Sequence, residues 1–201
     1  MSVKNNYIIV SLYSTVFIII AIITVYFPLW LKTSLGFDTN EIGFLLSSIG
    51  IIKFFSNFLI ISKIKNFNYL KIAMSTLAIL VILLFIIIVS FQPLLSKPLY
   101  MTLISFSLLL FAPILPMTEA VFNISKNRFS ENYGKIRLSG SLSFLLTVLL
   151  IGIFIEQYSL DIYPVLFLAA SFILLINIIF IKNQNSSINV LGYKNNIKGL
   201  I

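Results

Sequence analysis

Three ionisable side chains interrupt long apolar stretches of this chain: Lys53, Glu119 and Arg137. A charged side chain at the centre of a lipid bilayer costs on the order of 3 kcal/mol even on lenient insertion scales, so each needs a counter-charge or a wet cavity. Groups held in that way can bind a polar solute, or can change partners when the protein changes conformation. We therefore treat these three residues as candidates for substrate binding or coupling.

Glu119 and Arg137 are spaced as an ion pair would be. They lie 18 residues apart, and their midpoint, Arg128, falls in the polar stretch 126–132 between two apolar segments. Residues equidistant from the turn of an antiparallel helical hairpin lie at the same depth, and pairing lowers the cost of burying both charges. The spacing predicts a pair that works on a substrate or a proton, and a purely structural ion pair fits it equally well.

Lys53 belongs to a polar stripe on the second apolar segment. At 100° per residue, Gly43, Ser47, Gly50, Lys53 and Asn57 fall within about 120° of one another on a helix. We expect this stripe, including Gly50 and Asn57, to line a cavity. In the alternative interpretation Lys53 snorkels to the interface and the small residues permit close packing, but roughly 14 Å would separate Lys53 from the cytoplasmic end of the helix.

Two prolines, Pro113 and Pro116, precede Glu119 on the fourth apolar segment. Because proline removes a backbone hydrogen bond, a break or kink is expected there. Membrane helices tolerate such breaks where the backbone is buried in protein or lines water, so both prolines are predicted to line a cavity, as is Trp30 near the end of the first segment. The alternative is a structural kink that leaves Glu119 close to the cytoplasm.

The elements that must position these residues are membrane-spanning helices. The chain is 59% hydrophobic and 10% charged, with a mean hydropathy of +1.07. Apolar blocks of about 20 residues are long enough to cross a hydrocarbon core of roughly 30 Å. We predict an all-α integral membrane protein, with a six-helix bundle over residues 1–181 and a polar cytoplasmic tail over 182–201. The six spans are 7–31, 41–62, 69–91, 99–123, 136–157 and 161–181, of which the third and sixth are almost wholly aliphatic and are expected to be peripheral.

The charges of the loops set the expected orientation. Eleven cationic residues lie in the N-terminus, the loops after the second and fourth spans, and the tail, whereas the other loops hold only Lys32 and Lys97. The positive-inside rule then places both termini in the cytoplasm. This topology accounts for the net charge of +8, so we expect the lipid bilayer and not a nucleic acid as partner.

Cysteine and histidine are both absent from the sequence. Disulfides, thiolate or imidazole metal sites, and nucleophiles activated by histidine are therefore excluded. No metal, cofactor or enzymatic activity is expected, and a catalytic role for Lys53, Glu119 and Arg137 would lack a nucleophile and base around them.

Several stretches resemble the lactose permease and phenylpropionate permease group of the major facilitator superfamily. Residues 133–140 (Tyr-Gly-Lys-Ile-Arg-Leu-Ser-Gly) resemble its fifth-helix entry, 116–120 (Pro-Met-Thr-Glu-Ala) its fourth helix, 26–32 the end of its first, and 41–43 the start of its second. In lactose permease the matches of Glu119 and Arg137 pair and hold the sugar. Lys53 falls where the phenylpropionate branch has an arginine, which favours an anionic or aromatic substrate.

The resemblance implies a secondary active transporter in a bacterial inner membrane, a proton-coupled symporter of a small organic solute such as an aromatic acid or a sugar. It also implies that the chain is an N-terminal half built from two three-helix inverted repeats, with 25–28 corresponding to 110–113 and the tail beginning the central loop. Such a truncated half would be inactive alone and would need a C-terminal half or a homodimer partner. The loop 62–68 departs from the family by lacking its usual Gly and Asp.

Two other interpretations fit the length and charge. The chain could be a self-standing six-helix subunit, for example the substrate-capturing subunit of an energy-coupled importer, although that class does not explain the motifs around Glu119 and Arg137. It could also be the inactive product of a degraded or interrupted gene.

Overall fold

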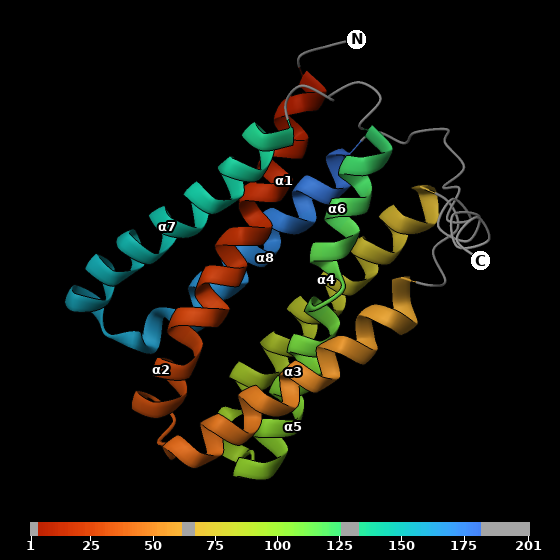
Figure 1. The fold of residues 1–201 in the computed structure, drawn as a ribbon. Helices are drawn as coiled ribbons and strands as arrows, with labels where there is room; N and C mark the ends of the chain where they lie inside the picture. Colours follow the sequence, from red (N-terminus) through yellow and green to blue (C-terminus); the bar gives the residue numbers. More distant parts are fainter. Residues whose placement is uncertain (1–3, 62–66, 126–132, 182–201) are drawn as a thin grey trace, which may run out of the picture.

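The computed structural model of the chain describes residues 4–61, 67–125 and 133–181, and the regular structure in these ranges is all helical (Figure 1). The polar stretch 126–132 with Arg128, the loop residues 62–66 and the tail 182–201 lie outside the described residues. The elements are α1 (Lys4–Ala21), a π-helical segment η1 (Ile22–Tyr26), α2 (Phe27–Thr33), α3 (Thr39–Ile61), α4 (Phe67–Ser90), η2 (Gln92–Leu94), α5 (Lys97–Phe111), α6 (Ile114–Ser125), α7 (Tyr133–Tyr158), η4 (Leu160–Ile162) and α8 (Tyr163–Phe180).

Every predicted span falls on a helical segment of the structure. The helices over Tyr7–Thr33, Phe67–Ser90, Lys97–Phe122, Gly134–Gln157 and Leu160–Phe180 are long and apolar enough to cross a membrane. These are the first, third, fourth, fifth and sixth spans. The second corresponds to α3, whose 23 residues extend about 35 Å at 1.5 Å per residue. An all-helical membrane fold is thereby confirmed, whereas the count of six crossings and the cytoplasmic termini stay predictions.

The helix pairing is symmetric between the two halves of the chain. Three sets of contacts join the first three spans to the last three. Helix α1 packs against α7 and α8, and helix α5 packs against α3 and α4. Helix α4 also packs against α8. Exchanging the first three spans with the last three leaves this set of pairs unchanged. Two three-helix repeats predict this pattern. The third and sixth spans, α4 and α8, each contact at least two other helices, so they are less peripheral than their aliphatic sequences suggest.

The first helices of the two predicted repeats are both interrupted, at the positions predicted to correspond. In the first span the Phe27 N–H donates to the Ile22 carbonyl, five residues earlier, directly before Pro28. In the fourth span α5 ends at Phe111 and α6 begins at Ile114, so Pro113 lies in the break. Proline lacks an N–H and crowds the carbonyl four residues earlier, which explains why each helix changes its hydrogen bonding there. The predicted break at Pro113 is confirmed.

A polar clamp joins α1 to α8. Ser11 Oγ donates to Asn177 Oδ1 at 2.9 Å, and Asn177 Nδ2 donates to Thr15 Oγ1 at 2.8 Å. Thr15 is buried and also donates to the Ser11 carbonyl at 2.7 Å. Hydrogen bonds between helices stabilise association inside a membrane, where lipid offers polar groups no alternative partner. Asn177 therefore fixes the sixth span against the first.

The contact between α1 and α7 is close because α7 carries a glycine there. A Cβ atom added to Gly140 would lie 2.8 Å from a ring carbon of Phe17, which is tighter than side chains tolerate. Gly43, on α3, has open space around the same position. Glycine in a helix interior is ordinarily a cost of about 0.5–1 kcal/mol relative to alanine, so its presence at residue 140 has a packing reason.

Gly140→Ala should lower the free energy of unfolding by about 1–3 kcal/mol, because the added methyl group forces Phe17 or the two helices apart. The matched variant Gly43→Ala should leave stability unchanged or raise it by up to about 1 kcal/mol. Thermal or SDS unfolding in detergent, followed by circular dichroism, measures both. Equal effects of the two substitutions would contradict the close α1–α7 contact.

Candidate functional site

Glu119 lies on α6, in the first half of that helix after the break at Pro113. Its side chain is half-buried, while the neighbouring Met117, Thr118 and Val121 are fully buried. The Thr118 hydroxyl donates to the Ile114 carbonyl at 2.8 Å and so satisfies its own helix. Glu119 is thus the ionisable group of this turn, and its carboxylate keeps partial access to a surface beside buried side chains.

A small core cluster brings the helices of Glu119 and Arg137 together. Its members are Ile9 and Tyr13 from α1, Phe122 from α6 and Ile136 from α7. The rings of Tyr13 and Phe122 meet edge to face, with centroids 6.5 Å apart. Phe122 lies one helical turn after Glu119, and Ile136 directly precedes Arg137, so the two charged residues stand at a similar depth on helices that meet through α1.

The ion pair predicted between Glu119 and Arg137 stays a prediction. Arg137 lies on α7 near its beginning, and its side chain is exposed on the surface of the chain. Within the described residues an ion pair forms elsewhere, between Lys97 Nζ and Glu41 Oε2 at 3.6 Å. What the structure contributes is the shared cluster, in which α6 and α7 both pack against α1.

Lys53 comes from α3, which belongs to the other repeat. Its side chain is half-buried, and Gly50, one turn earlier, is exposed with open space around it. Helix α3 packs mainly against α5 and touches α6. Lys53 is therefore outside the cluster around Tyr13, and the side chain of Asn57 lies outside the described residues.

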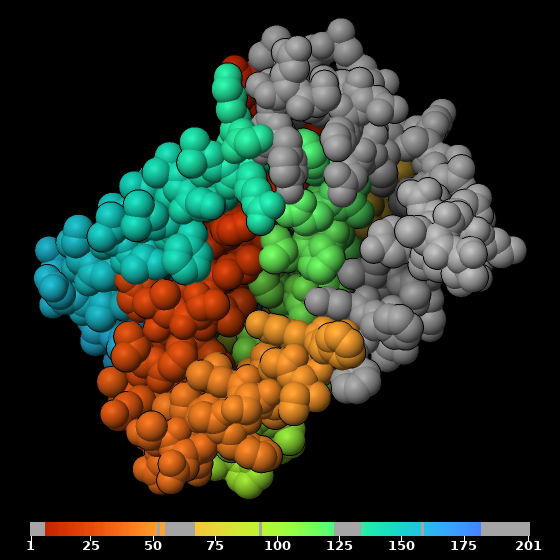
Figure 2. Space-filling view, viewed as in Figure 1, coloured from red at the N-terminus to blue at the C-terminus, as the bar shows by residue number. Residues whose placement is uncertain are grey.

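These three helices border one hollowed face of the molecule. In Figure 2, α6 is recessed between α3 on one side and the pair of α1 and α7 on the other. Lys53, Glu119 and Arg137 each come from one of the helices around this recess. These helices therefore bring two cations and one carboxylate to the same part of the fold, and a role for the three side chains in binding a solute stays a prediction.

The other predicted cavity-lining residues have different surroundings. Pro113 is buried in the break and Pro116 is half-buried in the first turn of α6. Trp30 is 2% exposed and lies in an aromatic cluster with Phe85, Tyr100 and Tyr163. The structure thus places Pro113 in the break of the fourth span, Pro116 and Glu119 on α6 after it, and Trp30 in the core.

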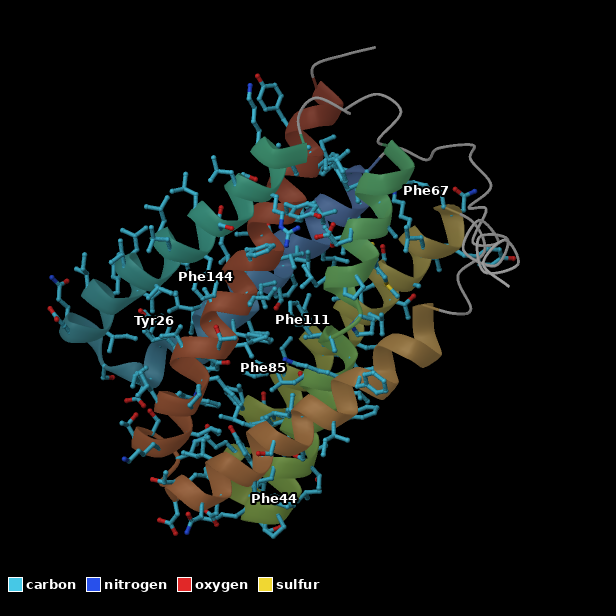
Figure 3. All side chains as sticks on the ribbon, viewed as in Figure 1. Tyr26, Phe44, Phe67, Phe85, Phe111 and Phe144 are labelled. Carbon is cyan, nitrogen blue, oxygen red and sulfur yellow. The ribbon has the colours of Figure 1, made fainter. Side chains whose placement is uncertain are left out.

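Tyr26 is a residue that the sequence reasoning missed. Its hydroxyl donates a hydrogen bond to the Val148 carbonyl on α7, so the π-helical segment of the first span is tied to the fifth (Figure 3). A Cβ added to Gly152 on α7 would lie 3.4 Å from the Tyr26 hydroxyl oxygen, so this hydroxyl lies close to the backbone of α7. π-Helical segments occur often at functional positions. The signal in the sequence was Pro28, two residues further on.

With this geometry established, comparisons with known proteins identify the family. Residues 7–198 match the MFS_1-like family. A stretch of 146 residues is 29% identical to a protein described as a probable 3-phenylpropionic acid transporter from Escherichia coli strain K12. That stretch is 73% of this chain and 38% of the relative, so the chain spans less than half of the relative's length. No solved structure matches significantly.

The match to the family covers nearly the whole chain and agrees with the helical membrane architecture, the paired repeats and the broken fourth span. It points to a transporter rather than an enzyme and to a multi-pass membrane protein. The chain belongs to the MFS_1-like family of the major facilitator superfamily.

Proposed function

We propose that the chain forms the N-terminal half of a secondary active transporter that moves a small organic acid, in symport with a proton. The observation that carries this proposal is the family match over residues 7–198. The similarity to a probable 3-phenylpropionic acid transporter favours an aromatic acid over a sugar.

The charges around the recess support an anionic substrate. Lys53 on α3 and Arg137 on α7 supply two cations, which can bind a carboxylate, and Arg137 can do so through two parallel hydrogen bonds. Glu119 on α6 is the group that can take and release the proton, because protonation would free Arg137 for the substrate. The aromatic part of the substrate would lie against apolar side chains of the same recess.

Transport requires a second half in this proposal, although the charged side chains that bind the carboxylate belong to this chain. Transporters of this superfamily bind substrate near the bilayer midplane between two halves, which rock against each other around it. The recess bordered by α3, α6 and α7 would then face a C-terminal half. Both termini would be cytoplasmic, in a bacterial inner membrane.

Substrate binding tests the proposal directly. The purified chain in lipid nanodiscs should bind 3-phenylpropionate at least tenfold more tightly than 3-phenylpropan-1-ol, which has the same ring without the carboxylate. Arg137→Gln and Lys53→Gln should each remove most of this preference, and Lys135→Gln, a neighbouring exposed cation, should not. Binding that prefers lactose to both compounds would contradict the acid and favour a sugar.

Uptake tests the need for a second half. In proteoliposomes with an imposed pH gradient, the chain alone should give no saturable uptake of 3-phenylpropionate. Saturable uptake by the chain alone that is lost in Glu119→Gln would contradict the half-transporter and favour a homodimer.

A further inference from the structure

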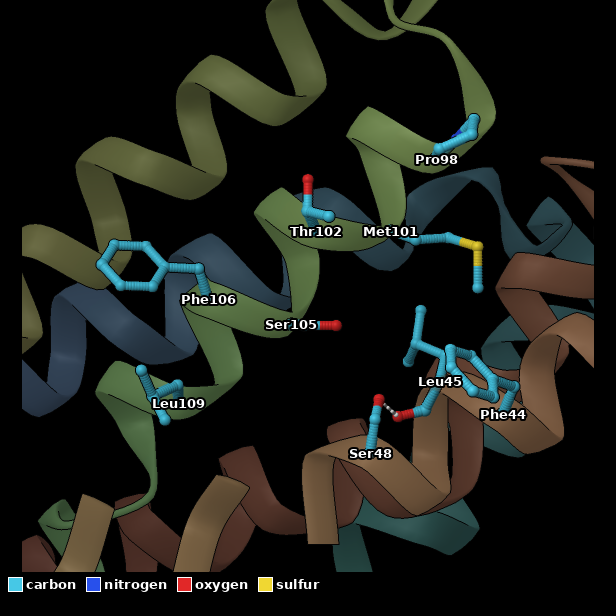
Figure 4. A pocket seen from close by; sticks show the side chains of 9 residues that line it. All are labelled: Phe44, Leu45, Ser48, Pro98, Met101, Thr102, Ser105, Phe106 and Leu109. Carbon is cyan, nitrogen blue, oxygen red and sulfur yellow. Dashed lines mark hydrogen bonds between the residues drawn. The ribbon is translucent and has the colours of Figure 1, made fainter. Parts of the chain in front are cut away.

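The two repeats differ at one equivalent pair of helices. Helices α1 and α7 are in close contact where Phe17 meets Gly140. Their counterparts in the repeat exchange, α5 and α3, pack less closely, and a cavity of about 500 Å³ lies between them. This cavity, the α3–α5 groove, is lined by Phe44, Leu45, Ser48, Pro98, Met101, Thr102, Ser105, Phe106 and Leu109 (Figure 4).

The walls of the groove are suited to an apolar occupant. Of its polar side chains, Ser48 donates to the Leu45 carbonyl and Thr102 donates to the Leu99 carbonyl, both at 2.8 Å. These hydroxyls are satisfied by their own helices, so they need no ligand. Phe44 and Phe106 add two aromatic side chains that are 74% and 52% exposed. An unfilled space of this kind would deprive the lining atoms of dispersion contacts.

The dimensions of the groove match one leaflet of a bilayer. It follows α5 from Pro98, the second residue of that helix, to Leu109. Eleven residues correspond to about 17 Å at 1.5 Å per residue, and half of a hydrocarbon core is about 15 Å. With α5 crossing the bilayer as predicted, the groove begins where the span leaves the membrane and ends near the bilayer centre.

A partly exposed cation, shared with a carboxylate, lies next to the end of the groove. Lys97 directly precedes Pro98, and its side chain is 53% exposed although it bonds to the Gly36 carbonyl at 3.1 Å and pairs with Glu41. An exposed ammonium at the level of the headgroups attracts a phosphate. An apolar groove next to a cation can bind a phospholipid, with the acyl chain in the groove and the phosphate near Lys97.

We propose that the α3–α5 groove binds one acyl chain of a membrane phospholipid, held more firmly than the lipids around the rest of the protein. The bound chain replaces the side-chain packing that joins α1 to α7 in the other repeat. It thereby supports α3, the helix that carries Lys53, at a place where side chains of the protein leave space. This site is separate from the recess proposed for the substrate.

Native mass spectrometry of the full chain tests the site. After incubation with dioleoylphosphatidylglycerol in detergent, the wild-type chain should carry one lipid at low lipid excess. Ser105→Phe, which fills the groove from α5, should reduce this one-lipid species at least fivefold. Leu83→Phe, a substitution at a 52% exposed position on α4, should leave it unchanged. Glycerol 3-phosphate, which has the headgroup chemistry without acyl chains, should not compete.

Ser48→Phe provides a second way to fill the groove, from α3, should Ser105→Phe fail to fold. The proposal is overturned if both folded variants keep the bound lipid, if the wild type retains none, or if glycerol 3-phosphate displaces it. It is also overturned if the substitutions reduce a dimer of the chain instead of a lipid adduct, because a second copy would then occupy the groove.

Discussion

Trp30→Ala should lower the free energy of unfolding by about 3–5 kcal/mol, the range for removing a large aromatic side chain from a packed core. The Trp30 ring stacks on Tyr163 with centroids 4.7 Å apart and lies 6.4 Å from the rings of both Phe85 and Tyr100. These partners come from α8, α4 and α5, so one side chain links four spans. Its removal leaves a cavity that none of these helices can close without moving the others.

Circular dichroism during SDS or thermal unfolding measures this loss, because Trp30 is the only tryptophan and fluorescence would disappear with it. Leu29→Ala is the matched control, since Leu29 is 46% exposed and should cost much less. Trp30→Phe should fall between the two. A stable Trp30→Ala chain with weaker substrate binding would contradict the core position and favour the cavity-lining role predicted from the sequence.

The spans and the break in the fourth helix could be predicted because their causes are local. A helix of about 20 apolar residues is long enough to span the bilayer in any protein. Pro113 likewise lacks a backbone N–H in any context. The π-helical segment before Pro28 has the same local cause, but a proline does not specify which adjustment a helix makes.

Tertiary packing could not be predicted in the same way. Trp30 near a span end fits an interfacial ring, a cavity wall or a core equally well, and only the neighbouring Phe85, Tyr100 and Tyr163 decide between them. Asn177 similarly appears as one polar interruption of an aliphatic span. Its bonds to Ser11 and Thr15 depend on how α8 is rotated against α1, and the apolar pattern of a membrane span contains little information on rotation.

The candidate site could be predicted only in part. Lys53, Glu119 and Arg137 were conspicuous because charges are rare inside apolar spans. The hairpin argument also predicted a common depth for Glu119 and Arg137, and the cluster around Tyr13 agrees with it. The sequence did not indicate that Phe122 and Ile136 join the cluster around Tyr13 of α1, since neither differs in type from its apolar neighbours.

If Glu119 pairs with Arg137 as predicted, Arg137→Gln alone should destabilise the chain by about 1–3 kcal/mol, because the half-buried Glu119 would lose its counter-charge. Glu119→Gln alone should cost less, since the exposed Arg137 can turn toward water or lipid headgroups. The double variant should be more stable than Arg137→Gln, with a coupling of about 1–3 kcal/mol between the two sites. Unfolding of all four chains in the same detergent gives this cycle.

Lys135→Gln serves as the control in that cycle, because Lys135 is an exposed cation on the same turn of α7. Combined with Glu119→Gln, it should show additive effects within about 0.5 kcal/mol. If Arg137 and Lys135 behave alike, the charge of α7 acts only through the general attraction of cations to the cytoplasmic surface. Additivity of Glu119→Gln and Arg137→Gln would then exclude the pair and leave Glu119 to act on a proton without the guanidinium.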